Sequence, residues 1–389
     1  MRQGMGYKKV VILGSTGSIG VNALKVIAKF PDQFKVVGLT AYSNVKLLEK
    51  QIKEFFPTHV AVTEKGGRYL KANVLSRKIK ILNVDHDLDQ LVTLRDVDIV
   101  LIAMRGSAAL KPFLSAVQAG KTVAPAKKDA LVVAGNFLME EAKRCGARVI
   151  PIDSEQSAIF QCLEGRDKDD LKKVILTASG GALLNVAKSQ FPRLSVKQIL
   201  NHPRWKMGKK ITVDSATLMN KGFEFIEAMV LFQLNAKQIK VVVHPEAIIH
   251  SMAEFKDGAI VAQLSVTDMR LPIQYALTYP QRWDSGLRGL DFARLGRLTF
   301  ENPDLEKFPS LALAISAGRR GGTLPCVLNA ANEEAVEAFL NQRISFPRIY
   351  EVVEKIVNRH KRIKKPNLET LLAIDCWARE EAKRFTIGN

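Results

Sequence analysis

The stretch KKVVILGSTGSIG, residues 8–20, decides the fold of this chain. Its first half, KKVVIL, is a short apolar run of the kind that forms a buried β-strand. Gly14, Gly17 and Gly20 follow with the spacing GxxGxxG, and the next residues carry their apolar side chains on one helical stripe. We therefore predict a strand, a glycine loop and a helix in direct succession.

Apolar runs like the first one recur over the first 150 residues and are separated by segments of helix length. They are FKVVGLT (34–40), THVAV (58–62), DIVLIAM (98–104), KTVAPA (121–126) and ARVIPID (147–153). Strands that alternate with helices predict an α/β fold with a Rossmann-like, doubly wound parallel sheet over residues 1–150.

The pattern changes after this region, and we predict two further domains. Residues 151–282 combine apolar runs, a helix and two runs joined through Lys256, Asp257 and Gly258 that predict an antiparallel hairpin, which indicates an α+β domain. Residues 283–311 are rich in Gly, Asp, Pro and charge and are interpreted as a linker. Helical spacing in residues 312–389 predicts a small all-helical C-terminal domain.

Composition indicates a folded, multidomain protein. The chain has 389 residues, of which 47% are hydrophobic and 25% charged, a length that exceeds one ordinary core. The net charge is +19, but Lys and Arg are spread along the whole chain. We therefore expect a solvated basic surface that attracts anionic phosphates, and no nucleic-acid partner.

Targeting and redox signals predict a cytoplasmic protein without a membrane partner. The N-terminus lacks an apolar signal core, and no run approaches the length of a membrane helix. The four cysteines, which lie far apart without a CxxC pair, suit reduced thiols and offer no thiolate metal site.

The glycine loop is a candidate dinucleotide site. The backbone N–H groups of Thr16, Gly17, Ser18 and Ile19 can face a pyrophosphate at the positive end of the following helix. The alternative is a tight turn between strand and helix in which Gly14, Gly17 and Gly20 are needed only for their backbone conformation. The loop spacing by itself does not decide between the two.

The end of the second predicted strand favours NADP over NAD. NAD-specific folds place a carboxylate there to hold the ribose 2′-hydroxyl. This chain has Tyr42, Ser43 and Asn44 instead, with Lys46 nearby. Hydroxyl, amide and ammonium donors accept a 2′-phosphate, which a carboxylate would repel.

A candidate metal site follows the last predicted strand of the parallel sheet. Asp153 and Glu155 flank Ser154, and in an extended chain residues two apart point the same way. Converging carboxylates repel unless a cation lies between them, so a hard divalent ion is the natural occupant. The alternative is that Ser154 starts a helix and Glu155 supports its first turn.

The helix NKGFEFIEA strengthens this interpretation. Asn220 and Glu224 are four residues apart and share one helix face, with Lys221 beside them. A carboxylate, an amide and an ammonium on one surface suit a metal ion and an anionic, oxygen-rich substrate. In isolation the same helix is more typical of a solvated charged face.

Two serines and an irregular stretch complete the candidate substrate site. Ser179 lies in TASGG after a strand and Ser215 lies before the helix, where hydroxyl and N–H groups can cradle a phosphate. His202 and Trp205 lie in an irregular stretch that resembles a mobile flap. The alternatives are capping serines, a structural histidine and a core tryptophan. His250 has no zinc-type spacing to another histidine.

Taken in order, these motifs resemble the 1-deoxy-D-xylulose 5-phosphate reductoisomerase family over essentially the whole chain. The matching stretches are GSTGSIG, IDSEQSA, TASGG, residues 201–228, HPEAIIHSM and DMRLPIQYAL. The resemblance implies a V-shaped homodimer that uses NADPH and Mg²⁺ or Mn²⁺. It also implies a role in isoprenoid precursor biosynthesis by the non-mevalonate route.

The family's functional residues transfer to matching positions of this sequence. The resemblance implies metal ligation by Asp153, Glu155 and Glu224, and catalytic roles for Lys128, Glu155, His202, Lys221 and His250. It implies substrate binding by Lys128, Ser154, Glu155, Ser179, His202, Trp205, Ser215, Asn220, Lys221 and Glu224. It implies cofactor binding by Gly14, Thr16, Gly17, Ser18, Ile19, Ser43, Asn44, Lys127, Asp129 and Gly208.

The implied reaction is the rearrangement of 1-deoxy-D-xylulose 5-phosphate and its reduction by NADPH to 2-C-methyl-D-erythritol 4-phosphate. The alternatives are an NADP-dependent reductase of another phosphorylated hydroxy-ketone and a non-catalytic NADP-binding regulator. The chain departs from the usual family residues at a few places. These are Tyr42, Lys127, Asp129, Gln156, Ala182, Leu183 and Thr267.

Overall fold

The computed structural model of the chain describes residues 7–74, 79–104, 106–205 and 207–386. Within it the chain divides into two compact units, each built from several segments. Unit 1 consists of Met1–Ala130, Leu138–Asp153 and Asp268–Leu287. Unit 2 consists of Leu131–Phe137, Ser154–Thr267 and Arg288–Asn389.

Unit 1 contains a seven-stranded parallel sheet with the strand order β4-β3-β2-β1-β5-β6-β7. The strands are β1 (Lys8–Leu13), β2 (Phe34–Ala41), β3 (His59–Val62), β4 (Lys80–Asn83), β5 (Ile99–Ile102), β6 (Thr122–Pro125) and β7 (Arg148–Val149). The order reverses between β1 and β5, which is the topological switch point of a doubly wound sheet. The predicted Rossmann-like fold is confirmed.

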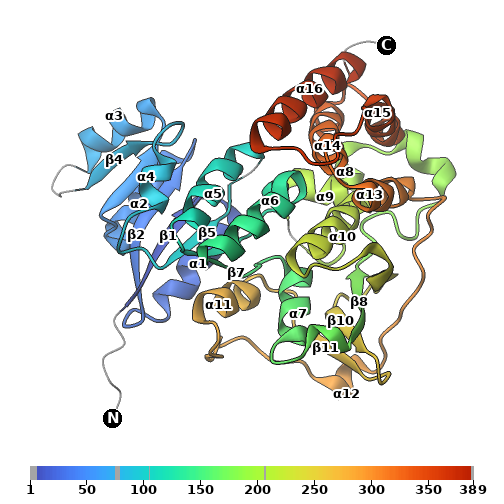
Figure 1. Cartoon of the computed structure of the whole chain (residues 1–389), viewed down its shortest axis with the longest axis horizontal. Helices are drawn as coiled ribbons and strands as arrows, with labels where there is room; N and C mark the ends of the chain where they lie inside the picture. Colours follow the sequence, from blue (N-terminus) through green and yellow to red (C-terminus); the bar gives the residue numbers. More distant parts are fainter. Residues whose placement is uncertain (1–6, 75–78, 105, 206, 387–389) are drawn as a thin grey trace. The chain divides into compact units, whose positions relative to one another are not determined.

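Helices connect the strands of unit 1 and cover the sheet (Figure 1). They are α1 (Ser18–Ala28), α2 (Val45–Phe55), α3 (Glu64–Asn73), α4 (Leu88–Val92), α5 (Leu110–Gln118), α6 (Asp129–Cys145), which continues into unit 2, and α11 (Arg270–Thr278). Val10, Val11, Ile12 and Leu13 of β1 are fully buried, since a central parallel strand is covered on both faces.

Unit 2 is built on a four-stranded mixed sheet with the order β11-β10-β8-β9. Its strands are β8 (Leu171–Ala178), β9 (Ile239–Val243), β10 (Ile249–Phe255) and β11 (Ile260–Leu264). The antiparallel pair β10 and β11 is the hairpin that the sequence predicted around Gly258, whose φ of +90° glycine adopts without strain.

The helices of unit 2 include the elements that carry most candidate site residues. They are α7 (Ser154–Leu163), α8 (Val196–Ile199), α9 (Lys209–Ala216), α10 (Met219–Leu231), α12 (Phe292–Leu295), α13 (Pro309–Arg320), α14 (Leu324–Leu340), α15 (Phe346–Arg359) and α16 (Leu368–Thr386). Helix α14 packs against α15 and α16, drawn in orange and red in Figure 1. The predicted helical character of the C-terminal region is therefore confirmed.

Over the described ranges, no helix is both long enough and apolar enough to cross a bilayer.

Candidate functional site

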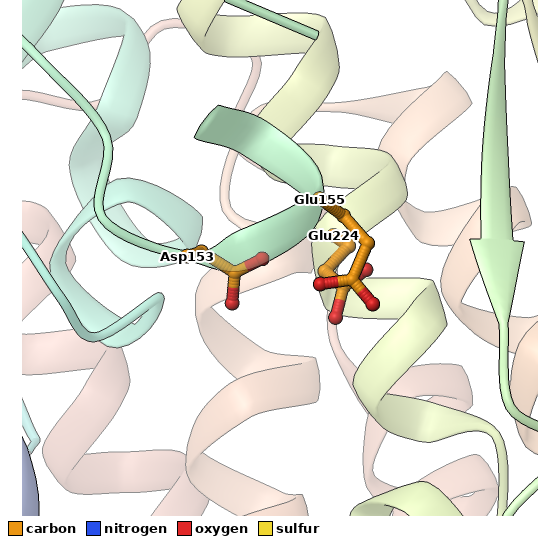
Figure 2. Close-up of side chains that lie close together, drawn as sticks. All are labelled: Asp153, Glu155 and Glu224. Carbon is orange, nitrogen blue, oxygen red and sulfur yellow. The ribbon is translucent and has the colours of Figure 1, made fainter. Parts of the chain in front are cut away.

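Three carboxylates converge at the start of α7. Side-chain oxygens of Asp153, Glu155 and Glu224 all lie within 4.8 Å of one another. Figure 2 shows the carboxylates of Glu155 and Glu224 directed at the same point, with Asp153 beside them. Asp153 is the last residue of its segment of unit 1 and is bonded directly to Ser154, the first residue of α7. This is the arrangement of oxygen ligands that a hard divalent cation prefers.

The local backbone differs from one prediction. Asp153 and Glu155 were expected to share one side of an extended chain, but Ser154 and Glu155 form the first turn of α7. Strand β7 ends at Val149, although the Ile150 and Ile152 N–H groups still donate to the carbonyls of Val123 and Pro125 on β6 at 2.9 and 3.0 Å. The extended-chain geometry is therefore wrong, although the two carboxylates still lie close together.

Lys221 holds the two glutamates of the cluster. Its ammonium donates to Glu155 Oε1 at 2.9 Å and also to Glu224 Oε2. Burial alone would lower the pKa of Lys221, but the adjacent charges of Glu155 and Glu224 raise it on balance. Lys221 therefore stays a buried cation at neutral pH. Asn220 donates from Nδ2 to Glu224 Oε1 at 2.6 Å, so the predicted common helix face is confirmed.

The third carboxylate is paired on one side only. Lys128, at the start of α6, forms an ion pair with Asp153 Oδ2. The other oxygen, Asp153 Oδ1, is buried and has no hydrogen-bond partner among the residues that the structure describes. A buried carboxylate oxygen is costly without a partner, and a cation would satisfy it.

Helix α10 buries its polar site residues. Glu224 is 0% exposed and Lys221 is 3% exposed, in a helix that is otherwise apolar on most faces. Buried charges persist only when they are paired or bind a metal ion. The buried surface of α10 therefore excludes the alternative of a solvated charged face.

The two candidate phosphate-binding serines lie on adjacent segments of unit 2. Ser179 follows β8, and Ser215 is buried in the last turn of α9. Gly181 has a φ of +68°, and a Cβ built there would lie 2.5 Å from the carbonyl oxygen of Ser215. Only glycine permits this close backbone approach. The TASGG loop and α9 are thus in direct contact.

His202 links the irregular stretch before α9 to the TASGG loop. Its Nδ1 accepts from the backbone N–H groups of Arg204 and Trp205 at 3.1 and 2.9 Å. The ring proton of the neutral form therefore belongs on Nε2, which lies 3.1 Å from Ser179 Oγ. Burial lowers the pKa of His202, so the ring is neutral near pH 7.

His250 and Trp205 lie together beside the cluster. Their ring centroids are 6.2 Å apart, and His250 lies on β10 with 5% exposure. Burial lowers the pKa of His250, while the nearby Glu155 charge opposes this shift. His244, by contrast, makes backbone contacts with Thr299 and Ile248 and is structural.

The glycine loop of unit 1 turns tightly between β1 and the start of α1. Gly14 donates to Thr40 Oγ1 at 2.8 Å, and a Cβ at Gly20 would lie 2.4 Å from the carbonyl oxygen of Gly14. Helix α1 begins at Ser18, and Gly17 caps it without a side-chain hydrogen bond. Its first amides, including that of Ile19, are therefore not capped by a side chain, as a phosphate-binding helix start requires.

Other cofactor candidates lie at nearby strand ends of unit 1. Ser43 and Asn44 are exposed after β2, and Asn44 also caps α2 by accepting from the Leu47 N–H at 3.2 Å. Lys127 precedes α6, and Asp129 Oδ2 accepts from the Gly106 N–H at 2.8 Å. Thr16, in the glycine loop, is half-buried. The last candidate, Gly208, lies in unit 2 as the N-cap of α9.

Sequence reasoning did not include Gln156 among the site residues. Its side chain is fully buried, and Nε2 donates to the backbone carbonyl of Glu224 at 2.8 Å. Its place next to Glu155 and its departure from the usual family residue were the available signals.

Sequence comparisons agree over nearly the full length. Models described as 1-deoxy-D-xylulose 5-phosphate reductoisomerase, its C-terminal domain and the DXP reductoisomerase C-terminal domain match residues 10–135, 149–232 and 264–381. The chain is 48% identical over 380 residues to the 1-deoxy-D-xylulose 5-phosphate reductoisomerases of Thermoanaerobacter pseudethanolicus and Thermodesulfovibrio yellowstonii. Each alignment covers 97% of this chain and 99% of the relative.

Solved structures give the same result. A DOX-P reductoisomerase in complex with NADPH, fosmidomycin and magnesium superposes with a TM-score of 0.93 at 38% identity, covering 97% of this chain and 98% of that one. The Zymomonas mobilis 1-deoxy-D-xylulose 5-phosphate reductoisomerase in complex with NADPH superposes with a TM-score of 0.92 at 37% identity, covering 98% and 100%. With this fold and these relatives, the chain belongs to the 1-deoxy-D-xylulose 5-phosphate reductoisomerase family.

Proposed function

We propose that this chain converts 1-deoxy-D-xylulose 5-phosphate to 2-C-methyl-D-erythritol 4-phosphate with NADPH and a divalent metal ion. The observation that carries the proposal is the convergence of Asp153, Glu155 and Glu224 around one point, with Lys221 between the two glutamates. Family membership supplies the substrate class, and the carboxylate cluster supplies the chemistry that such a substrate needs.

The donor set suits Mg²⁺ or Mn²⁺. The candidate ligands are carboxylate oxygens, and Asp153 Oδ1 is buried without a hydrogen-bond partner in the described part of the chain. Hard cations prefer such oxygens over nitrogen or sulfur. A related DOX-P reductoisomerase was solved with magnesium. When bound, the ion would supply Lewis-acid stabilisation of negative charge on the substrate oxygens.

The side chains around the cluster would bind and orient the sugar phosphate. Lys221 and Lys128 provide ammonium groups for its hydroxyl and carbonyl oxygens, together with Ser154 and Asn220. Lys221 is 3% exposed and Lys128 9%, so both charges act in a site of low polarity where they are effective. These groups would hold developing negative charge without reorganising during the reaction.

The phosphate would lie near the TASGG loop and α9. Ser179, Ser215 and His202 supply hydroxyl and N–H donors there, and the His202 Nε2 proton already points at Ser179. Trp205 would cover the substrate from the irregular stretch that precedes α9. Excluding water in this way strengthens the electrostatic contacts within the site.

NADPH would bind at the glycine loop of unit 1 and supply the hydride. The loop amides of Thr16, Ser18 and Ile19 suit a pyrophosphate at the start of α1, whereas the Gly17 N–H, which the sequence also predicted to face it, donates to the Gly14 carbonyl at 3.2 Å. The end of β2 offers Ser43 and Asn44 in place of a carboxylate, which suits the 2′-phosphate of NADPH. Lys127, Asp129 and Gly208 are proposed as further contacts.

Three finer points belong to the same proposal. The chain would act as a homodimer in the cytoplasm, as its resemblance and its reduced cysteines suggest. The domain limits at residues 150, 282 and 311 also remain predictions.

The test is a substrate-dependent assay of NADPH absorbance with purified full-length protein. We expect oxidation of NADPH that requires both 1-deoxy-D-xylulose 5-phosphate and Mn²⁺ or Mg²⁺, with NADH much less effective. Chelation of the metal should stop turnover, and adding the metal back should restore it. Product is identified by mass and NMR.

Control reactions separate the alternatives. Oxidation with another phosphorylated hydroxy-ketone, but not with 1-deoxy-D-xylulose 5-phosphate, would favour a reductase of different specificity. NADPH binding without turnover of any such substrate would favour a non-catalytic regulator. Either result would overturn the proposed reaction.

A further inference from the structure

Gln156 lies at the contact between the two helices that carry the glutamates of the cluster. It is in the first turn of α7, directly after Glu155, and its side chain is 0% exposed. Its Nε2 donates to the backbone carbonyl of Glu224 on α10 at 2.8 Å. The side chain of Gln156, the residue after Glu155, is therefore hydrogen-bonded to the backbone of Glu224.

This hydrogen bond joins the helices at the level of the cluster. Glu155 and Glu224 are 69 positions apart in the sequence, but a carboxylate oxygen of each lies within 4.8 Å of the other. Helices α7 and α10 are in contact, and both glutamates share the Lys221 ammonium. A carbonyl in a helix has a second lone pair, which the Gln156 amide can use without breaking the helix.

Gln156 keeps this position at a cost to stability. Its Oε1 is buried and has no hydrogen-bond partner within the described ranges. An apolar side chain of the same length would fill the space without a buried, unpaired acceptor. Packing alone therefore does not explain why this position carries an amide. The hydrogen bond that the amide donates to the Glu224 carbonyl does explain it.

We propose that Gln156 is a positioning residue for the cation site. By holding the α10 backbone at Glu224 against α7, its amide fixes the separation of the Glu155 and Glu224 carboxylates in the metal-free protein. The inference rests on the proposed function, in which these carboxylates bind a divalent ion. Lys221 pairs with both glutamates but neutralises only one of their two charges, so the carboxylates still repel and a loose helix contact would let them separate. A small ion with strict geometry would then bind less tightly.

The test measures Mn²⁺ affinity directly, without substrate or turnover. Gln156→Met removes the donor and keeps the length of the side chain. Free Mn²⁺ is titrated by electron paramagnetic resonance with full-length protein. We expect the Kd of Gln156→Met to rise by about 10-fold, the effect typical of groups that orient metal ligands. NADPH affinity, measured by fluorescence, should stay unchanged.

The matched control is Gln161→Met in the same helix. Gln161 donates to Ser157 Oγ at 3.1 Å within α7, and it is half-buried. Its substitution should leave the Kd for Mn²⁺ at the wild-type value. If Gln156→Met does not fold, Gln156→Asn keeps the amide and shortens its reach by one methylene, and the same 10-fold rise is expected.

The outcomes distinguish this inference from the proposed function. Equal Mn²⁺ affinities in the wild type, the folded Gln156 variant and Gln161→Met would overturn the positioning role and leave the metal site standing. A wild-type protein that binds no Mn²⁺ would overturn the metal site and the positioning role together. A selective loss at Gln156 supports both.

Discussion

The charges of single residues are balanced around the carboxylate cluster. Asp153, Glu155 and Glu224 contribute three negative charges, and Lys128 and Lys221 contribute two positive ones through direct ion pairs. One negative charge remains, which attracts a cation, and a bound divalent ion would leave the site positive for an anionic substrate. Because these groups are buried or half-buried, removing one of them has a larger effect than on the surface.

Glu224→Gln is therefore the decisive substitution at this scale. The amide keeps the shape of the side chain but removes a charge that the proposed metal and Lys221 both use. We expect metal-dependent turnover to fall by at least about 100-fold. NADPH binding should be nearly unchanged, because the glycine loop lies in the other unit. Steady-state kinetics and NADPH fluorescence measure the two effects.

A matched control for this substitution is Glu254→Gln on β10. Glu254 pairs with Lys172 and Lys173 at 2.7 and 2.8 Å, away from the cluster residues. Its neutralisation should leave turnover within about 2-fold, because its partners are partly exposed lysines that no part of the proposed site uses. Full activity in Glu224→Gln would contradict the proposed metal site.

The sequence predicted the members of this cluster but not their contacts. Asp153 and Glu155 could be found because they are two residues apart, and Glu224 because it shares a helix face with Asn220. The hydrogen bond from Gln156 to Glu224 joins residues far apart in the chain, and no local pattern encodes it. Tertiary contacts of this kind are visible only after folding.

At the scale of elements, α10 depends on a close approach to α13. Gly222 is buried, and a Cβ built there would lie 2.3 Å from Ala314 Cβ. Contact distances that short do not occur, so the helices would have to separate. The same helix carries Asn220, Lys221 and Glu224, which means that its packing and the site geometry are coupled.

Gly222→Ala should therefore destabilise the protein. Alanine favours a helix over glycine, but overpacking against Ala314 outweighs this gain. We expect a loss of about 1–3 kcal/mol in the free energy of unfolding, measured by urea denaturation. Gly289→Ala is the control, because a Cβ at Gly289 meets nothing within 4 Å. A Gly222→Ala variant as stable as this control would show that α13 can shift without cost.

Most elements could be predicted from local patterns, and the exceptions have physical reasons. Strand β1 and its glycine loop, the β10–β11 hairpin and helix α15 each have a strong apolar period. Strand β4 (KILN) was missed because it is short and lies at the sheet edge, where one neighbour gives little burial. The predicted run 147–153 forms a regular strand only over Arg148–Val149, although the N–H groups of Ile150 and Ile152 still donate to β6 carbonyls.

At the scale of the whole molecule, unit 1 is not a continuous stretch of sequence. Asp268–Leu287 returns to it after more than a hundred residues of unit 2. Trp283 packs against Phe30 and Phe34, with ring centroids 4.9 and 5.7 Å apart. Lys8 also donates to the carbonyls of Leu277 and Tyr279, both at 3.2 Å. Local patterns could not reveal this return, because it depends on long-range contacts.

A fragment of residues 1–150 should therefore be an incomplete folding unit. Without residues 268–287 it exposes the surface of α1 that packs against α11, together with Phe30 and Phe34. We expect its free energy of unfolding to be at least about 3 kcal/mol lower than that of the same fragment joined to residues 268–287 by a flexible linker. Urea unfolding followed by circular dichroism measures the difference, and NADPH fluorescence reports whether the glycine loop is formed.

If residues 1–150 alone unfold cooperatively and bind NADPH as tightly as the joined fragment does, the boundary at residue 150 holds and the returning segment is dispensable. A stable joined fragment beside an unstable short one would instead show that NADPH-binding structure in this family member requires two separate parts of its chain.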